Sequence, residues 1–201
     1  MSTDRIATLE RRTLESEVAV TIRVDGTGSA QISTGLGFLD HMLNTLAKHG
    51  LFDLVVSAKG DTHVDSHHTA EDVAITLGRA LSSALGDRAG LVRIAHAYAP
   101  LDEALARVVI DAGGRGYAVF VGELRSERLG ELDSDMVRHF VETLAIEGRL
   151  NIHVDLIHGI NAHHQAEAIF KALARALDAA TRIDPRLEGR IPSAKGVIDK
   201  G

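Results

Sequence analysis

Apolar and polar residues alternate along the first part of the chain and then change to a helical spacing. The alternation at residues 18–24 stops at Asp25-Gly26, which predicts a half-buried strand ending in a turn. A second strand is predicted at residues 30–34. Apolar residues three and four apart from Leu36 to Gly50 then indicate an amphipathic helix with a glycine stop. Residues 51–58 predict a third strand, followed by a helix from Ser66, the expected N-cap, to Gly86.

The same order of elements returns in the second part of the chain. The pattern predicts strands at 104–110 and 117–121, a helix at 136–146, a strand at 150–157 and a helix at 163–180 that Asn161 caps. We therefore expect an α+β fold with an internal duplication: two β-β-α-β-α halves joined near residues 86–90. The expected units are a first half at 1–90, a second half at 91–186 and a C-terminal tail at 187–201.

Short motifs repeat together with these elements. The sequence His67-His68-Thr69-Ala70-Glu71 reappears as His163-His164-Gln165-Ala166-Glu167, and the two helices continue with similar residues. Upstream of each motif, His41 and His139 stand in similar blocks. Three blocks recur in the same order, which is the signature of a duplicated unit.

Composition directs attention to these histidines. The chain of 201 residues has 11 histidines and no cysteine, so a metal would be bound through nitrogen and oxygen. A net charge of -6 argues against nucleic-acid binding, which normally needs a basic excess. No apolar run approaches the roughly 20 residues of a membrane span, and no secretory signal is recognisable, so a cytoplasmic protein is expected.

The repeated motif predicts metal ligands. Residues four apart share a helix face, so His67 and Glu71 can point in the same direction, as can His163 and Glu167. The second histidine of each motif lies about 100° further round the helix. One copy could thus serve two different ions. The six imidazoles and two carboxylates divide into two sites of three nitrogens and one oxygen, a set that suits manganese, iron or zinc. The expected ligands are His41, His67, His68, Glu71, His139, His163, His164 and Glu167.

Other interpretations of the motif remain open at this point. A single helix start can carry two exposed histidines without any function, although two matched copies argue against that. The same donors would also fit a dinuclear hydrolase with a bridging water, or a shell in which metal only organises assembly. The pattern leaves open whether the two motifs of one chain meet or whether sites form between subunits.

From Arg11 to Val197 the sequence closely resembles the imidazoleglycerol-phosphate dehydratase family. The resemblance rests on Thr34-Gly35-Leu36-Gly37-Phe38-Leu39-Asp40-His41 and on Pro192-Ser193-Ala194-Lys195-Gly196. Further matching blocks lie at residues 60–72, 100–104, 111–115, 138–140 and 163–167. The chain departs from the usual family residues at Thr45, Leu101, Gly116 and Ala194, among others.

The resemblance implies a ribosomal protein S5 domain 2-like duplicated fold and a manganese enzyme with two ions per active site. It implies a homo-oligomer of twenty-four subunits with active sites between chains, which removes water from a small phosphorylated imidazole substrate in histidine biosynthesis. Phosphate and substrate binding would fall to residues that the metal pattern does not identify: Arg93, Arg115, Lys171, Ser193 and Lys195.

The chemistry requires an electron sink, because no carbonyl activates the C–H bond that breaks. The imidazole ring of the substrate can serve when metal ions hold its nitrogens, since ring electrons can then expel the adjacent hydroxyl. A carboxylate is expected to act as acid or base. The candidates are Glu15, Glu71, Glu167 and Asp102, with the individual roles left open.

Overall fold

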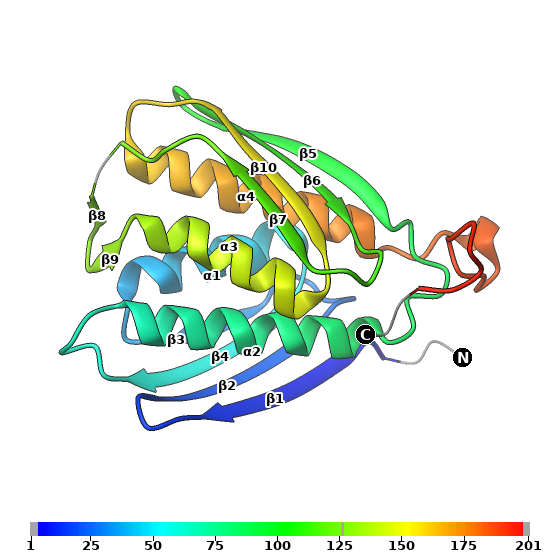
Figure 1. Ribbon diagram of the computed structural model, residues 1–201, viewed down its shortest axis with the longest axis horizontal. Helices are drawn as coiled ribbons and strands as arrows, with labels where there is room; N and C mark the ends of the chain where they lie inside the picture. Colours follow the sequence, from blue (N-terminus) through cyan, green and yellow to red (C-terminus); the bar gives the residue numbers. More distant parts are fainter. Residues whose placement is uncertain (1–3, 126, 199–201) are drawn as a thin grey trace.

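The computed structural model describes residues 4–125 and 127–198, so the outermost residues of the expected first half and tail (1–3 and 199–201) lie outside it. Two four-stranded sheets form the outer layers (Figure 1). The first sheet has the order β1-β2-β4-β3 and the second the order β5-β6-β10-β7. In each sheet the last strand pairs in parallel and the other pairs are antiparallel. The two sheets therefore share one topology.

The inner strands β2 and β6 alternate buried residues with residues that are mostly partly exposed, as half-buried strands do. The first sheet consists of β1 (Ile6–Arg12), β2 (Ser16–Arg23), β3 (Ala30–Ser33) and β4 (Asp53–Gly60). The second consists of β5 (Ile94–Leu101), β6 (Ala104–Asp111), β7 (Tyr117–Val121) and β10 (Asn151–His158). A small hairpin of β8 (Arg128–Leu129) and β9 (Leu132–Asp133) leads into the third helix.

Four helices fill the space between the sheets and bury their apolar faces there (Figure 1). They are α1 (Gly37–Gly50), α2 (His67–Leu85), α3 (Asp135–Gly148) and α4 (Ala162–Thr181), followed by a short 3-10 helix, η1 (Pro185–Leu187). Helices from opposite halves pack together, α1 on α4 and α2 on α3. The α2–α3 contact is close at Gly78, where a Cβ would lie 2.8 Å from the Glu147 side chain. Within the described residues, no helix has the length and apolar character needed to cross a membrane.

The predicted β-β-α-β-α order is confirmed in both halves, but the structure adds a strand at the start of each. These strands, β1 and β5, lie at the sheet edges, where fewer large apolar residues are needed. The sequence of β5, IAHAYAPL, is rich in alanine and contains Pro100, so its apolar alternation is weak. The pattern of apolar residues was therefore insufficient to predict either strand.

One of the two predicted helix caps is confirmed. The Asn161 carboxamide accepts hydrogen bonds from the backbone N–H groups of His163 and His164 at the start of α4. Ser66 does occupy the N-cap position of α2, but its hydroxyl does not cap the helix. The Asp65 carboxylate accepts the hydrogen bond from the His67 backbone N–H instead, at 2.8 Å. Prediction of Ser66 as the capping side chain was wrong because its acidic neighbour supplies the acceptor.

Arg88 ties the connection between the halves to the end of α3. Its guanidinium is buried and donates to the carbonyl oxygens of Ala112, Gly148 and Arg149 at 2.8–3.0 Å. Carbonyls at a helix C-terminus lack helical partners, so a cation there is favourable. Burial lowers the pKa of Arg88 to about 10, which still leaves the side chain protonated at neutral pH.

Replacement of Arg88 by alanine is expected to destabilise the fold by about 3 kcal/mol, because three buried carbonyls lose a charged donor. Chemical denaturation at constant protein and metal concentration would measure the loss. Arg182→Ala provides the control, since the Arg182 side chain is exposed and, among the described residues, pairs only with Asp178 at its own helix end. Equal stability of the two variants would contradict this role for Arg88.

Candidate metal centre and substrate site

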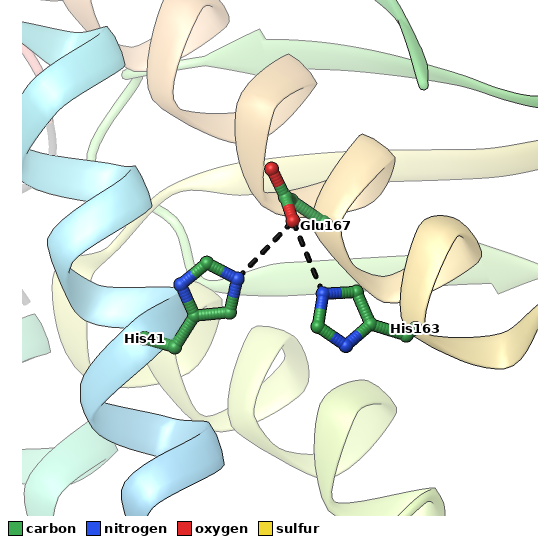
Figure 2. A group of neighbouring side chains, drawn as sticks. All are labelled: His41, His163 and Glu167. Atoms are coloured by element: carbon green, nitrogen blue, oxygen red, sulfur yellow. Dashed lines mark hydrogen bonds and ion pairs between the residues drawn. The ribbon is translucent and has the colours of Figure 1, made fainter. Parts of the chain in front are cut away.

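The first donor cluster joins α1 to the start of α4. The Nε2 atoms of His41 and His163 lie 3.1 and 3.3 Å from the same Glu167 oxygen (Figure 2). His163 and Glu167 are one helical turn apart on α4, whereas His41 comes from the other half of the chain. Two imidazoles and one carboxylate thus converge within 4.8 Å of one another.

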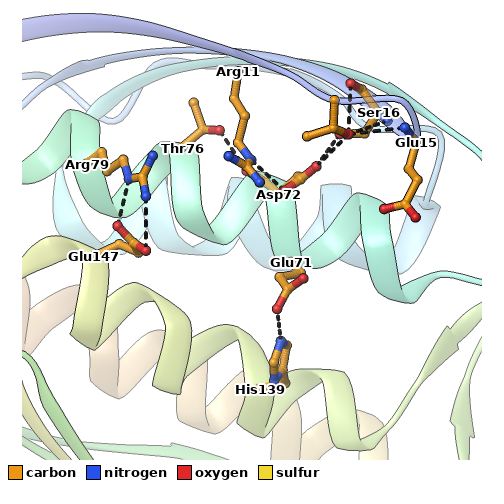
Figure 3. A network of polar contacts seen from close by, with 10 residues as sticks. Arg11, Glu15, Ser16, Glu71, Asp72, Thr76, Arg79, His139 and Glu147 are labelled. Atoms are coloured by element: carbon orange, nitrogen blue, oxygen red, sulfur yellow. Dashed lines mark hydrogen bonds and ion pairs between the residues drawn. The ribbon is translucent and has the colours of Figure 1, made fainter.

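The second cluster is the counterpart of the first. Here α2 supplies His67 and Glu71, and α3 supplies His139, whose Nε2 lies 3.0 Å from a Glu71 oxygen (Figure 3). The rings of His67 and His139 are 4.9 Å apart, centre to centre. Each cluster therefore combines a His-x-x-x-Glu pair from one half with a histidine from the other.

Lys171 holds the free oxygen of Glu167. Its ammonium lies 2.7 Å from Glu167 Oε1, while Oε2 faces the two imidazoles. Burial disfavours the charge on Glu167, but the hydrogen bonds from Lys171 and His41 outweigh it and lower its pKa. The carboxylate is therefore ionised at neutral pH, the form that can bind a cation.

His68 and His164 lie outside both clusters, although they adjoin them in sequence. The Nδ1 atom of His68 lies 3.0 Å from Asp61, and that of His164 lies 2.7 Å from Glu103. An imidazole that donates Nδ1–H to a carboxylate keeps Nε2 unprotonated and available, an arrangement common for metal-binding histidines. These hydrogen bonds raise the pKa of both histidines.

The sequence pattern singled out neither Glu103 nor Asp61, although both orient these histidines. Glu103 also accepts hydrogen bonds from the backbone N–H groups of Ile160 and Asn161. The Asn161 N–H, the His164 ring and the Ile160 N–H together lower the pKa of Glu103 to about 2. Both residues, Asp61 and Glu103, lie in blocks that match the family, at 60–72 and 100–104, but neither their spacing nor the repeat gave a reason to single them out.

The predicted acid-base candidates Glu15 and Asp102 lie beside His68 and His164, respectively. Glu15 Oε1 lies 3.8 Å from His68 Nε2, and Asp102 Oδ2 lies 3.9 Å from His164 Nε2. Both carboxylates are exposed, and both stand in the turn between the first two strands of their sheet. The two halves thus place an acidic group at corresponding points.

Four residues expected to bind phosphate lie at the other end of the molecule. Arg93 pairs with Asp111 at 2.6 Å and donates to the Pro192 carbonyl at 2.7 Å, which attaches the tail to the second half. The Arg93 backbone N–H donates to the Ala180 carbonyl, in the last turn of α4. The others are Arg115 in the turn before β7 and Ser193 and Lys195 in the tail. Lys171 is separate from them, beside Glu167.

The donor clusters suit a divalent transition-metal ion. Imidazole nitrogen with a carboxylate oxygen favours manganese, iron or zinc over calcium or magnesium, which prefer oxygen alone. Each cluster in one chain offers three ligand atoms, fewer than a six-coordinate ion accepts. Further donors would have to come from elsewhere.

A duplicated α+β fold with two imidazole-carboxylate clusters places the chain among proteins with candidate sites for divalent metal ions. A family profile described as imidazoleglycerol-phosphate dehydratase matches residues 34–177. A relative of that description from Chloroflexus aggregans is 59% identical over 198 residues, covering 98% of this chain and 97% of the relative. One from Dehalococcoides mccartyi is 53% identical over 197 residues, covering 98% and 99%.

Solved structures agree with the sequence comparisons. The crystal structure of the dehydratase from Staphylococcus aureus superimposes with a TM-score of 0.80 at 38% identity, covering 89% of this chain and 99% of that one. The enzyme from Pyrococcus furiosus gives 0.80 at 33% identity, covering 94% and 99%. The chain belongs to the imidazoleglycerol-phosphate dehydratase family. It is a hydro-lyase of histidine biosynthesis that acts on a small phosphorylated imidazole.

Proposed function

We propose that this dehydration depends on manganese, with two ions in each active site. We further propose that each active site combines residues of more than one subunit of a homo-oligomer, with the twenty-four copies that the family resemblance implies. The proposed ligands are the two clusters together with His68 and His164. A cytoplasmic location accords with a role in amino-acid biosynthesis.

The position of the phosphate-binding candidates is the observation that carries this proposal. His163 stands in the first turn of α4, whereas Arg93 is attached to its last turn. At about 1.5 Å per residue, the helix separates the two by roughly 25 Å. A glycerol phosphate chain on an imidazole ring is far too short to reach from one to the other. This distance supports a site in which the metal-binding end of one chain meets the phosphate-binding end of another.

The second histidine of each His-His motif, His68 or His164, supports the same arrangement. Each cluster lacks a third imidazole, and each His-His motif holds one beside the cluster with its Nδ1 fixed by a carboxylate. Their Nε2 atoms can complete a cluster on a neighbouring subunit. Metal binding would then stabilise the assembly, since ligands from two chains share one ion.

This chain's residues divide the remaining tasks. Bound metal would hold the substrate ring as an anion and so supply the electron sink. Arg93, Arg115, Ser193 and Lys195 would bind the phosphate, and Lys171 would contact the substrate beside Glu167. An acid or base beside the reacting carbons would come from Glu15, Asp102, Glu71 or Glu167.

Three segments would carry these tasks. In this proposal residues 1–90 and 91–186 form the two halves, and residues 187–201 form a tail that helps to bind phosphate. The hydrogen bond from Arg93 to the Pro192 carbonyl supports the role of the tail, because it orders the segment that precedes Ser193 and Lys195.

Manganese titration tests the proposal. The protein is stripped of metal with a chelator, and manganese is then added while light scattering follows particle mass. Imidazoleglycerol phosphate consumption and imidazole acetol phosphate formation are measured in parallel. We expect mass and turnover to rise together and to saturate at about two ions per chain, since each chain carries two clusters.

Other outcomes distinguish the alternatives. Release of inorganic phosphate without the ketone product would favour a dinuclear hydrolase, and assembly without turnover would favour a metal-organised shell. Full turnover in metal-free protein would contradict the proposed metal dependence.

A further inference from the structure

A buried polar network connects the start of α2 to the turn that carries Glu15. Its centre is Asp72, whose side chain is 6% exposed and immediately follows Glu71 in the chain. One Asp72 oxygen accepts from Arg11 Nε at 2.6 Å, and the other accepts from Ser16 Oγ at 2.5 Å (Figure 3). The carboxylate therefore joins β1 and β2 to the helix.

The network continues through the turn to Glu15. Thr13 Oγ1 donates to Asp72 and accepts from the backbone N–H groups of Glu15 and Ser16 at 3.2 and 3.0 Å. The Glu15 carbonyl in turn accepts from the Asp61 N–H at 3.1 Å. The backbone of Glu15 is thus fixed on both sides, while its carboxylate is left free to face His68.

The second half of the chain shows that the fold itself does not need these polar groups. Ser16 is the first residue of β2, and Ala104 is the first residue of β6. Arg11 is the register partner of Val18, the third residue of β2, and Ala99 is the register partner of Ala106, the third residue of β6. Aligning the two His-His motifs places Asp72 opposite Ala168. The equivalents of the three polar residues are buried alanines: Ala99, Ala104 and Ala168.

A largely buried ion pair such as Arg11–Asp72 stabilises a fold little more than apolar residues at the same positions would, so stability alone does not explain its presence in one half. In the first half the network holds a turn of three residues, 13–15, with Glu15 at its exposed corner, whereas the corresponding turn with Asp102 has two residues, 102–103. We infer that Asp72, with Arg11 and Ser16, is a positioning residue that holds Glu15 in place for the reaction. This inference rests on the catalytic role proposed for Glu15.

Replacement of Asp72 by asparagine tests the inference, because it keeps the shape and removes the charge. We expect kcat to fall roughly a hundredfold, since a displacement of about 1 Å in a reacting group has that effect. KM, manganese bound per chain and particle mass should stay within about twofold of wild type, because neither cluster loses a ligand.

A triple variant guards against misfolding. Arg11→Ala, Ser16→Ala and Asp72→Ala together introduce the alanines that stand at the corresponding positions of the second half. This variant should assemble and show the same loss of kcat.

A double-mutant cycle tests whether Asp72 affects kcat through Glu15. If Asp72 acts through Glu15, then adding Asp72→Asn to Glu15→Gln should lower kcat no further. Arg79→Gln is the matched control, because Arg79 lies on the same helix, pairs with Glu147 at 2.7 Å and points away from the turn (Figure 3). It should leave kcat unchanged.

Three results would overturn the inference. These are wild-type kcat in Asp72→Asn and in the triple variant, a full effect of Asp72→Asn in the Glu15→Gln background, or loss of bound manganese that accounts for the lower kcat. Failure of the proposed function would look different, because the wild-type enzyme would then turn over without manganese.

Discussion

Replacement of Glu167 by alanine is expected to reduce turnover by roughly a hundredfold or more and to lower the manganese content by one ion per chain. Glu167 is the only carboxylate of its cluster, and both imidazoles meet the same oxygen. Its loss also leaves the half-buried Lys171 without its partner. Metal analysis after gel filtration and a product assay would measure the two effects.

Glu142→Ala is the matched control for Glu167. Glu142 lies on α3 and pairs with Arg138 one turn away, outside both clusters. Its variant should keep metal content and turnover. A Glu167→Ala enzyme with two tightly bound ions and normal activity would show that the cluster is not a metal site.

Mixing two inactive variants is expected to restore activity. Glu167→Ala removes a proposed metal ligand, and Lys195→Ala removes a proposed phosphate contact at the other end of the molecule. If each active site takes these residues from different chains, co-assembled particles contain intact sites. About a quarter of the sites should then be intact, because two chains must each contribute a wild-type residue. The measurement is turnover after the metal-free variants are mixed in equal amounts and reassembled with manganese.

The double variant Glu167→Ala with Lys195→Ala provides the control for this experiment. When the double variant is mixed with either single variant, all chains share one substitution, so every site lacks at least one of the two residues. Activity should therefore stay at the level of the single variants. Absence of any recovery in the mixture of single variants, despite joint assembly shown by mass, would mean that both residues serve a site from the same chain.

Most of the fold could be predicted from sequence because its inner elements carry strong periodicity. The helices α2 and α4 bury one apolar stripe each, and β2 and β6 alternate buried and exposed residues. Edge strands are different. One face of β5 is covered mainly by alanine, which fits strands and helices alike, so its sequence pattern did not reveal a strand.

The site was predictable only in part. Helical spacing indicated that His163 and Glu167 share a face, but spacing cannot tell which helix lies opposite, so the contact with His41 needed the fold. The carboxylates that orient the second histidine of each His-His motif stand in loops, where sequence distance has no fixed relation to distance in space. For Asp72 a signal did exist: the two repeats differ there, aspartate against alanine.

Each donor cluster draws on both halves of the chain, and this has an evolutionary consequence. A single ancestral repeat would hold one His-x-x-x-Glu pair and one histidine on its other helix, with no way to bring them together itself. Two copies facing each other would form both clusters at once. Fusion of the genes would then have converted an association of two molecules into contacts within one chain. It would also have allowed one copy to acquire charged residues that the other copy lacks.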